Sequence, residues 1–127
     1  MDLKIKLLEW PEGGNYLILI ARGLINAEGF ERIFGKVAET SQALLDCRFL
    51  IDLEETTLTV EPLDIHLLVN GLGTDLRRHN NKIALVSSTD ADDSARLRAL
   101  SDSLRGLGLQ IAVFDDARGA VAWLSQL

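Results

Sequence analysis

The sequence contains 127 residues, of which 47% are hydrophobic and 25% are charged, and its formal net charge is −6 with a pI of about 4.8. This length and composition predict one globular domain over residues 1–127, and the acidic balance argues against a nucleic-acid partner. Cys47 is the only cysteine and the apolar runs are strand-sized, so we expect a cytoplasmic protein without disulfides or an integral membrane segment.

The N-terminal residues predict an antiparallel hairpin. Leu3, Ile5 and Leu7 alternate with lysines, which is typical of a strand with one wet face at a sheet edge. The segment Pro11–Asn15 has the composition of a turn, and Tyr16–Ala21 is almost entirely apolar, as expected of an interior strand.

The next segments predict a helix and a buried parallel strand. Asn26 is a suitable N-cap for a helix from Ala27 to about Asp46, whose apolar residues recur at helical spacing. Phe49–Leu53 reads as a buried strand, and we expect the crossover before it to be right-handed. The residues after this strand, 54–61, read as an acidic, threonine-rich connection.

Pro62 suits the first turn of the following helix, because its missing N–H has no intrahelical role there. Gly71 and Gly73 each weaken a helix by about 1 kcal/mol relative to alanine. They indicate either close packing against the sheet or an early end of the helix near Asn70. The apolar stripe of this helix is expected to be buried and consists of Ile65, Leu68, Val69, Leu72 and Leu76.

The C-terminal third repeats the alternation. Ile83–Val86 predicts a strand, Asp90 lies in a capping-box-like start of a third helix, and Leu109–Phe114 predicts the last strand. Asp115 or Asp116 is expected to cap a short final helix. The fold class is therefore α/β, a single mixed sheet of about five strands with about four helices in the order β-β-α-β-α-β-α-β-α.

The sequence offers no convincing catalytic or metal site. His66 and His79 have no neighbouring ligand, and Cys47 has no local base. Acidic residues follow three predicted strands, where they could hold Mg²⁺ but where helix caps also need carboxylates. Because capping explains most of them, we expect neither a metal nor a cofactor. These acidic residues are Asp52, Glu54, Glu55, Asp90, Asp92, Asp93, Asp115 and Asp116.

The order of elements and several local patterns resemble the STAS domains, the superfamily of the anti-sigma-factor antagonists. The similarity covers residues 16–127 and rests on Ala21–Ile25, Phe49–Leu53, Val113–Asp116 and Ala120–Leu124. The last two segments especially are similar to a compact, uncharacterised bacterial branch of the superfamily. The resemblance implies a small, non-enzymatic signalling module that acts by protein–protein interaction in the cytosol.

Members of this superfamily bind a partner protein through the start of their second helix, where a phosphorylatable serine controls affinity. The corresponding stretch here, Leu58–Leu63, contains neither that serine nor its Asp-Ser-Ser-Gly-like surroundings. Independently of the family, a segment that follows a buried strand and opens a helix is a favoured place for recognition. We therefore expect partner binding at Thr57, Thr59, Glu61 and Asp64.

Two other interpretations remain open from the sequence. Residues 57–64 can be a solvated connection in which Thr59 or Glu61 merely caps the helix. The protein can also be a small-molecule or lipid-binding domain that uses a pocket between a helix and the sheet. Neither the partner nor a homodimer is specified by the sequence.

Overall fold

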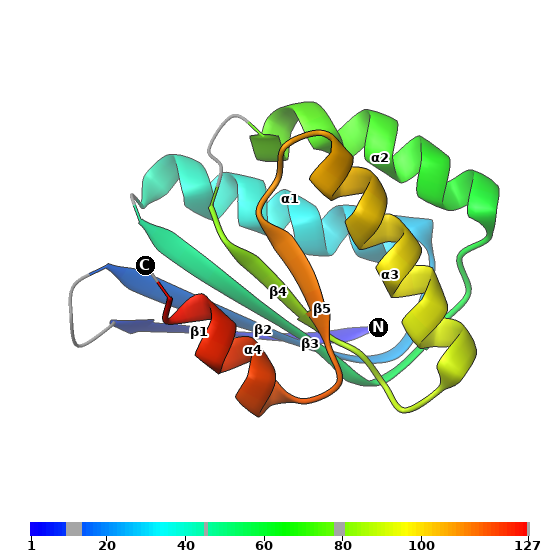
Figure 1. The fold of residues 1–127 in the computed structure, drawn as a ribbon, viewed down its shortest axis with the longest axis horizontal. Helices are drawn as coiled ribbons and strands as arrows, with labels where there is room; N and C mark the ends of the chain where they lie inside the picture. Colours follow the sequence, from blue (N-terminus) through cyan, green and yellow to red (C-terminus); the bar gives the residue numbers. More distant parts are fainter. Residues whose placement is uncertain (10–13, 45, 78–80, 127) are drawn as a thin grey trace.

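The computed structural model describes residues 1–9, 14–44, 46–77 and 81–126. Within these residues the order of elements is the predicted one (Figure 1). The strands are β1 (Asp2–Glu9), β2 (Asn15–Ile25), β3 (Cys47–Leu58), β4 (Ile83–Val86) and β5 (Ile111–Phe114). The helices are α1 (Ala27–Ala43), α2 (Pro62–Arg77), α3 (Ala91–Gly106) and α4 (Ala117–Leu124). No helix within the described residues combines the length and the apolar character needed to cross a membrane.

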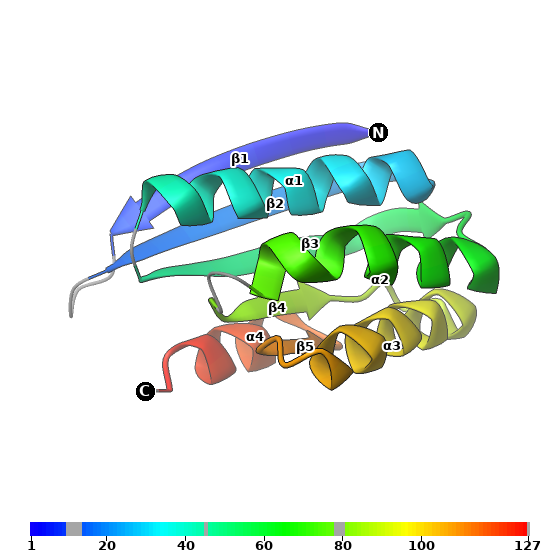
Figure 2. The same cartoon turned by 90° about the horizontal axis from the view of Figure 1, so that it is seen from above.

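The strands form one sheet of five in the order β1-β2-β3-β4-β5, with β1 antiparallel to β2 and all later neighbours parallel. This confirms the predicted mixed sheet. Because successive crossovers advance in the same direction and share one hand, they place α1, α2 and α3 on one face of the sheet (Figure 2). The last helix, α4, packs on the opposite face.

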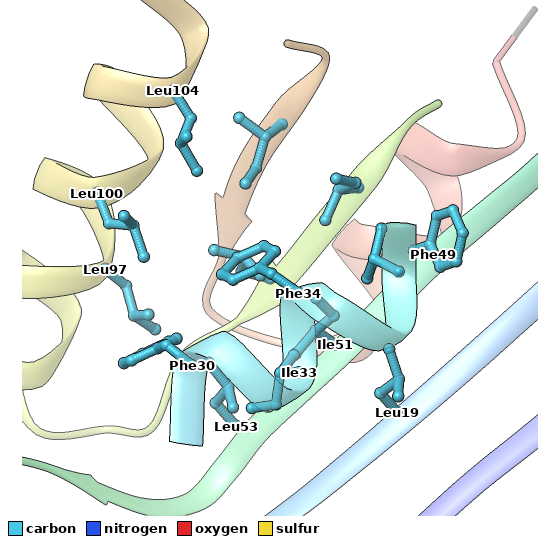
Figure 3. Close-up of a cluster of buried hydrophobic side chains, with 14 of the residues drawn as sticks. Leu19, Phe30, Ile33, Phe34, Phe49, Ile51, Leu53, Leu97, Leu100 and Leu104 are labelled. Atoms are coloured by element: carbon cyan, nitrogen blue, oxygen red, sulfur yellow. The ribbon is translucent and has the colours of Figure 1, made fainter. Parts of the chain in front are cut away.

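The main hydrophobic core lies between the sheet and α1, α2 and α3. Figure 3 shows its part between α1, α3 and the strands. Phe30, Ile33 and Phe34 of α1 are almost fully buried, and the two phenylalanine ring centroids lie 6.3 Å apart. They pack over inward-facing residues of β2 and β3, which is how an apolar helical stripe and a parallel sheet exclude water from each other. Leu97, Leu100 and Leu104 of α3 form an apolar ridge on the same core. In α2, Ile65, Leu68 and Leu76 are buried as predicted, while Val69 and Leu72 pack against the core half-buried.

A smaller core lies under α4 on the opposite face. Ala120 and Leu124 pack there against Tyr16, Leu50 and other strand residues. At its rim the ring centroids of Phe114 and Trp123 lie 5.7 Å apart, and the Lys82 ammonium lies 5.1 Å from the Trp123 ring centroid. The helix α4 contacts β3, β4 and β5, and the small core beneath it extends to Tyr16 and Ile18 of β2.

The predicted ends of β2 and β3 were wrong. Both strands continue past the sheet's other members, so residues 54–58 belong to β3 and are not a connection. A β-bulge separates the two parts, because Leu53 and Glu54 of β3 lie opposite the single residue Ala21 of β2. The extra residue interrupts the alternation of buried and exposed side chains, and the segment therefore resembles a loop in the sequence.

The helix boundaries also correct several predictions. The first helix ends at Ala43 and not near Asp46, and α2 continues through Gly71 to Arg77 instead of ending near Asn70. A Cβ atom at Gly71 would meet nothing within 4 Å, so close packing does not explain this glycine. In the last helix Val121 is 39% exposed. Residues 11–13 of the predicted turn and His79 lie outside the described residues.

Candidate protein-binding surface

The end of β3 is shaped by side chains that satisfy the polar groups of the bulge. The Asp52 carboxylate accepts a hydrogen bond from the Glu54 N–H at 3.0 Å, and the buried Thr56 hydroxyl donates to the Leu53 carbonyl at 2.7 Å. Local bonds of this kind substitute for the ladder bonds that a bulge removes. Asp52 therefore has a structural role at the sheet edge.

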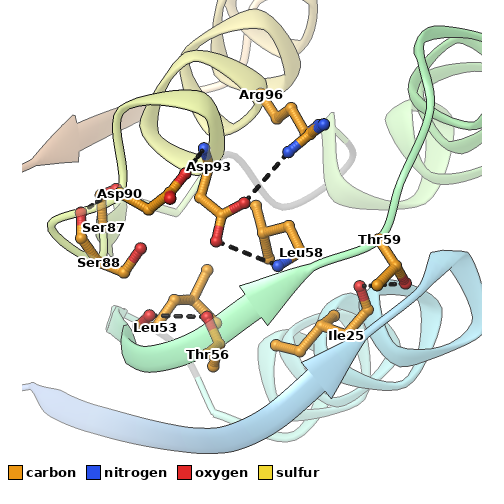
Figure 4. Close-up of polar contacts among 10 residues, drawn as sticks. All are labelled: Ile25, Leu53, Thr56, Leu58, Thr59, Ser87, Ser88, Asp90, Asp93 and Arg96. Atoms are coloured by element: carbon orange, nitrogen blue, oxygen red, sulfur yellow. Dashed lines mark hydrogen bonds and ion pairs between the residues drawn. The ribbon is translucent and has the colours of Figure 1, made fainter.

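A buried carboxylate on α3 fixes the last residue of β3 (Figure 4). Asp93 is 4% exposed, and its Oδ2 accepts a hydrogen bond from the Leu58 N–H at 3.2 Å. Its Oδ1 lies 3.2 Å from Arg96 Nη1, and its own N–H donates to the capping carboxylate of Asp90 at 2.9 Å. The start of α3 is thus tied to the position where the chain leaves the sheet for α2.

The structure places the four predicted site residues in different local roles. Thr57 is exposed on β3 in register with Leu24 of β2, and the Thr59 N–H and hydroxyl donate to the Ile25 carbonyl at 2.9 and 3.2 Å. The Glu61 N–H donates to Asp64 Oδ2 at 2.9 Å, which is the arrangement of an N-cap residue and a helical carboxylate three positions later. Thr59 and Asp64 therefore hold the chain in place, whereas Thr57 and Glu61 have exposed side chains.

Two exposed leucines beside these residues were missed by the sequence analysis. Leu63 and Leu67 are 67% and 60% exposed and lie one helical turn apart on the outer face of α2. The sequence analysis assigned the buried stripe of α2 correctly, and the leucines left outside that stripe were the available signal. We call Thr57, Thr59, Glu61, Leu63, Asp64 and Leu67 the α2-start surface.

Most of the acidic residues suspected of metal binding are engaged in structural contacts. Asp90 and Asp116 cap α3 and α4 by accepting from the N–H groups of Asp93 and Gly119. Asp115 pairs with Arg98, and Glu55 pairs with Arg22 at 2.7 Å. These contacts confirm the capping interpretation for Asp90 and Asp116. In the described part of the chain no three histidine, cysteine, aspartate or glutamate side chains are placed to share a metal ion.

Three of the described titratable groups, Tyr16, Cys47 and Glu54, have raised pKa values, and burial is the first cause of each shift. Burial raises the pKa of the Cys47 thiol to about 11, so the group stays protonated at neutral pH and is a poor nucleophile. The pKa of Glu54 is raised by partial burial, and by the neighbouring carboxylates of Asp52, Asp116 and Glu55. Each shift disfavours the charged form of the group.

Among the described residues, a groove between a helix and the sheet bears on the alternative ligand-binding function. A groove of about 510 Å³ runs between β1 and α1 and is lined by two apolar residues of β1 and by polar residues of α1. Ligand pockets for small molecules are usually enclosed and predominantly apolar. The lining residues are Leu3, Ile5, Glu31, Arg32, Gly35, Lys36 and Glu39.

Comparison with solved structures assigns the fold. Over 96% of this chain and 93% of the other, the structure is similar to an uncharacterised protein of the DUF3478 family with a SpoIIAA-like fold from Shewanella loihica, with a TM-score of 0.57 and 19% identity. It is equally similar to the anti-sigma factor antagonist SpoIIAA in its unphosphorylated form, with a TM-score of 0.56 and 12% identity over 99% of this chain and 100% of that one. The chain has a STAS-like fold.

The STAS-like fold confirms the predicted architecture. Because the sequence identities are 19% and 12%, the fold alone does not indicate the function. No protein-family model matches the chain, and no curated protein matches it significantly. We therefore infer the function of this chain from the residues on its own surface.

Proposed function

We propose that this chain is a non-enzymatic regulatory module that binds a partner protein through the α2-start surface. The observation that carries the proposal is the pair of exposed leucines, Leu63 and Leu67, beside the exposed carboxylate of Glu61. Apolar side chains one turn apart on a helix are the contacts that a groove or a helix of a partner can bury.

The rigidity of the surroundings supports the same surface. Asp93 holds the Leu58 N–H, Thr59 holds Ile25, and Asp64 caps α2, so the backbone that presents the leucines is fixed at three successive points. A preorganised surface loses little conformational entropy when it binds. The likeness to the anti-sigma factor antagonist SpoIIAA, a protein named for its action on another regulator, adds support at the level of the fold.

The α2-start surface contains no serine, and its hydroxyl groups belong to Thr57 and Thr59. The Glu61 carboxylate instead places a permanent negative charge at the N-terminus of α2, where the helix dipole stabilises it. We propose that the surface is always competent to bind.

The experiment that tests the function is capture of the partner from extract of the source organism, with the full chain as bait. Glu61→Lys and Leu67→Lys are the test variants. Glu61→Lys should cost about 0.5–1 kcal/mol of stability, and Leu67→Lys, at an exposed position, less than about 0.5 kcal/mol. Both should abolish capture of the protein that wild-type bait retains.

Val121→Lys is the matched control, because Val121 is an exposed apolar residue of α4 on the opposite face of the sheet. It should leave capture unchanged. Asp64→Lys is less informative, because it also removes the bond to the Glu61 N–H. Undiminished capture by folded Glu61→Lys and Leu67→Lys proteins would move the interface away from α2.

A further inference from the structure

The outer edge of β1 has the properties of a strand-binding site. The sheet ends at β5 on one side, a strand of 4 residues, and at β1 on the other, a strand of 8 residues. Short edge strands prevent unwanted pairing, whereas a long edge strand offers a row of main-chain donors and acceptors. Among the described residues no strand pairs with the outer side of β1 (Figure 2).

Side chains on β1 lie in two rows, one with Asp2, Lys4, Lys6 and Leu8 and the other with Leu3, Ile5, Leu7 and Glu9. Lys4 and Lys6 lie opposite Ile20 and Ile18 of β2, on the face of the sheet that carries α4. Ile5 and Leu7 lie opposite Leu19 and Leu17, on the face that carries α1, and they are 42% and 53% exposed. Lys4 and Lys6 form no ion pair with any residue that the structure describes.

The groove between β1 and α1 continues the apolar row. Its floor is formed by Leu3 and Ile5, and Gly35 lies in its α1 wall. A glycine inside a helix costs about 0.5–1 kcal/mol relative to alanine. A Cβ atom at Gly35 would meet nothing within 4 Å, so no contact inside the described chain requires a glycine there. The missing side chain leaves room for atoms from outside the described chain.

We propose that the outer edge of β1 binds an extended segment of another protein as an additional strand, and that this segment alternates carboxylate and apolar side chains. The carboxylates would lie beside Lys4 and Lys6, and the apolar side chains would fill the groove next to Ile5 and Gly35. Opposite charges and apolar pairs directly across two strands each stabilise pairing. This site lies at the opposite side of α1 from α2 and is independent of the α2-start surface.

In three registers a second copy of this chain would bring lysines together at the same edge. An antiparallel pair of β1 strands centred on Ile5 would place Lys4 opposite Lys6 of the other copy. A pair centred on Lys4 or on Lys6 would place that lysine opposite itself. Like charges directly across two strands are destabilising, and each copy also carries a net charge of −6. An acidic segment of a different protein would place carboxylates, and not lysines, opposite Lys4 and Lys6.

The test uses a capped synthetic peptide in which glutamate alternates with valine over the length of β1, added to the full ¹⁵N-labelled chain. We expect amide shifts confined to β1 and the groove, and slower hydrogen exchange of β1 amides. Lys4→Glu combined with Lys6→Glu should weaken binding at least about tenfold, which is the effect of about 1.4 kcal/mol. A lysine–valine peptide should recover binding to that double variant.

Further variants separate the groove from the charges. Gly35→Trp should fill the groove and block the peptide, while Gly35→Ala should retain it, with folding of both checked by circular dichroism. Arg98→Glu combined with Arg105→Glu makes the same charge change on α3 and should leave binding unchanged. Glu61→Lys should also leave it unchanged, so failure here and failure of the proposed function are distinguishable.

Three results would overturn the inference. One is an absence of β1 shifts at millimolar peptide, or an equal response of the wild-type chain to the glutamate and lysine peptides. Another is a concentration-dependent dimer that protects β1 amides, which would make a second copy the occupant. The third is protection of β1 by phosphatidylglycerol vesicles but not by the peptide, which would assign this edge to a membrane surface.

Discussion

Replacement of Asp93 tests whether one buried carboxylate holds the end of β3. Asp93→Ala leaves the Leu58 N–H without its acceptor in a place where little water reaches it. An unsatisfied buried donor costs about 1–3 kcal/mol. The contact with Arg96 adds little, because the Arg96 side chain is 36% exposed and surface ion pairs contribute about 0–1 kcal/mol. We therefore expect a loss of about 2–3 kcal/mol in the free energy of unfolding.

Asp92→Ala is the matched control. Asp92 lies beside Asp93 in the first turn of α3 and is exposed, so its removal changes the same charge near the same helix dipole without touching β3. Its cost should be about 0.3–1 kcal/mol. Asp93→Asn retains an oxygen that can accept from Leu58, and its cost should lie between those of the two alanine variants.

Urea denaturation measures these differences, provided that the dependence of the unfolding free energy on urea concentration is unchanged. Hydrogen exchange adds a local readout, because the Leu58 amide should exchange faster in Asp93→Ala than in Asp92→Ala. Equal stabilities of the two alanine variants, within about 0.5 kcal/mol, together with an unchanged Leu58 amide, would show that the bond between α3 and β3 contributes nothing.

Two further predictions concern the core and the acidic edge. Leu68→Ala should destabilise the protein by about 2–5 kcal/mol, because Leu68 is 3% exposed. Leu67→Ala on the same helix should cost less than about 0.5 kcal/mol, because Leu67 is exposed. Equal melting temperatures of the two variants would show that α2 is not part of the core. The pKa of Glu54 is raised in the folded protein, so ionisation of Glu54 opposes folding. The stability that protonated Glu54 contributes is fully present below its unfolded-state pKa and is lost as pH rises through its folded-state pKa. Glu54→Gln should therefore stabilise the protein at pH 7 by up to about 0.5 kcal/mol, given the exposure of the group. The difference from wild type should vanish in acid. A difference in melting temperature that stays constant over this pH range would contradict the raised pKa of Glu54.

The architecture was predictable because its signals are local. Apolar runs at β4 and β5, helical spacing in α1 and α3, and the caps Asn26 and Asp116 each specify one element without reference to the rest of the chain. The order of these elements then leaves few topologies.

The extension of β2 and β3 was not predictable in the same way. Gly23 adopts a φ of 98° within β2, and Glu54 and Glu55 are consecutive exposed residues within β3. Both features are typical of loops in a sequence, and only the pairing between the two strands makes them a ribbon. Tertiary pairing therefore overrode the local pattern.

The candidate site shows the same division. Residues 57–64 were singled out by position, but the sequence could not separate the members that hold the backbone, Thr59 and Asp64, from those that face outward. It also could not show that Asp93, far along the chain, reaches Leu58. Hydrogen bonds between distant residues leave no periodic signal.

The strand order has a consequence for how the chain folds. Every hydrogen-bonded neighbour in the sheet is also the neighbour in sequence, so each pairing closes one hairpin or one crossover and never joins distant ends of the chain. The entropic cost of loop closure is then divided among several short connections, which favours rapid folding. During synthesis each strand can add to the edge left by the previous one. The edge of β4, whose residues are all buried in the finished sheet, is not protected until β5 has left the ribosome.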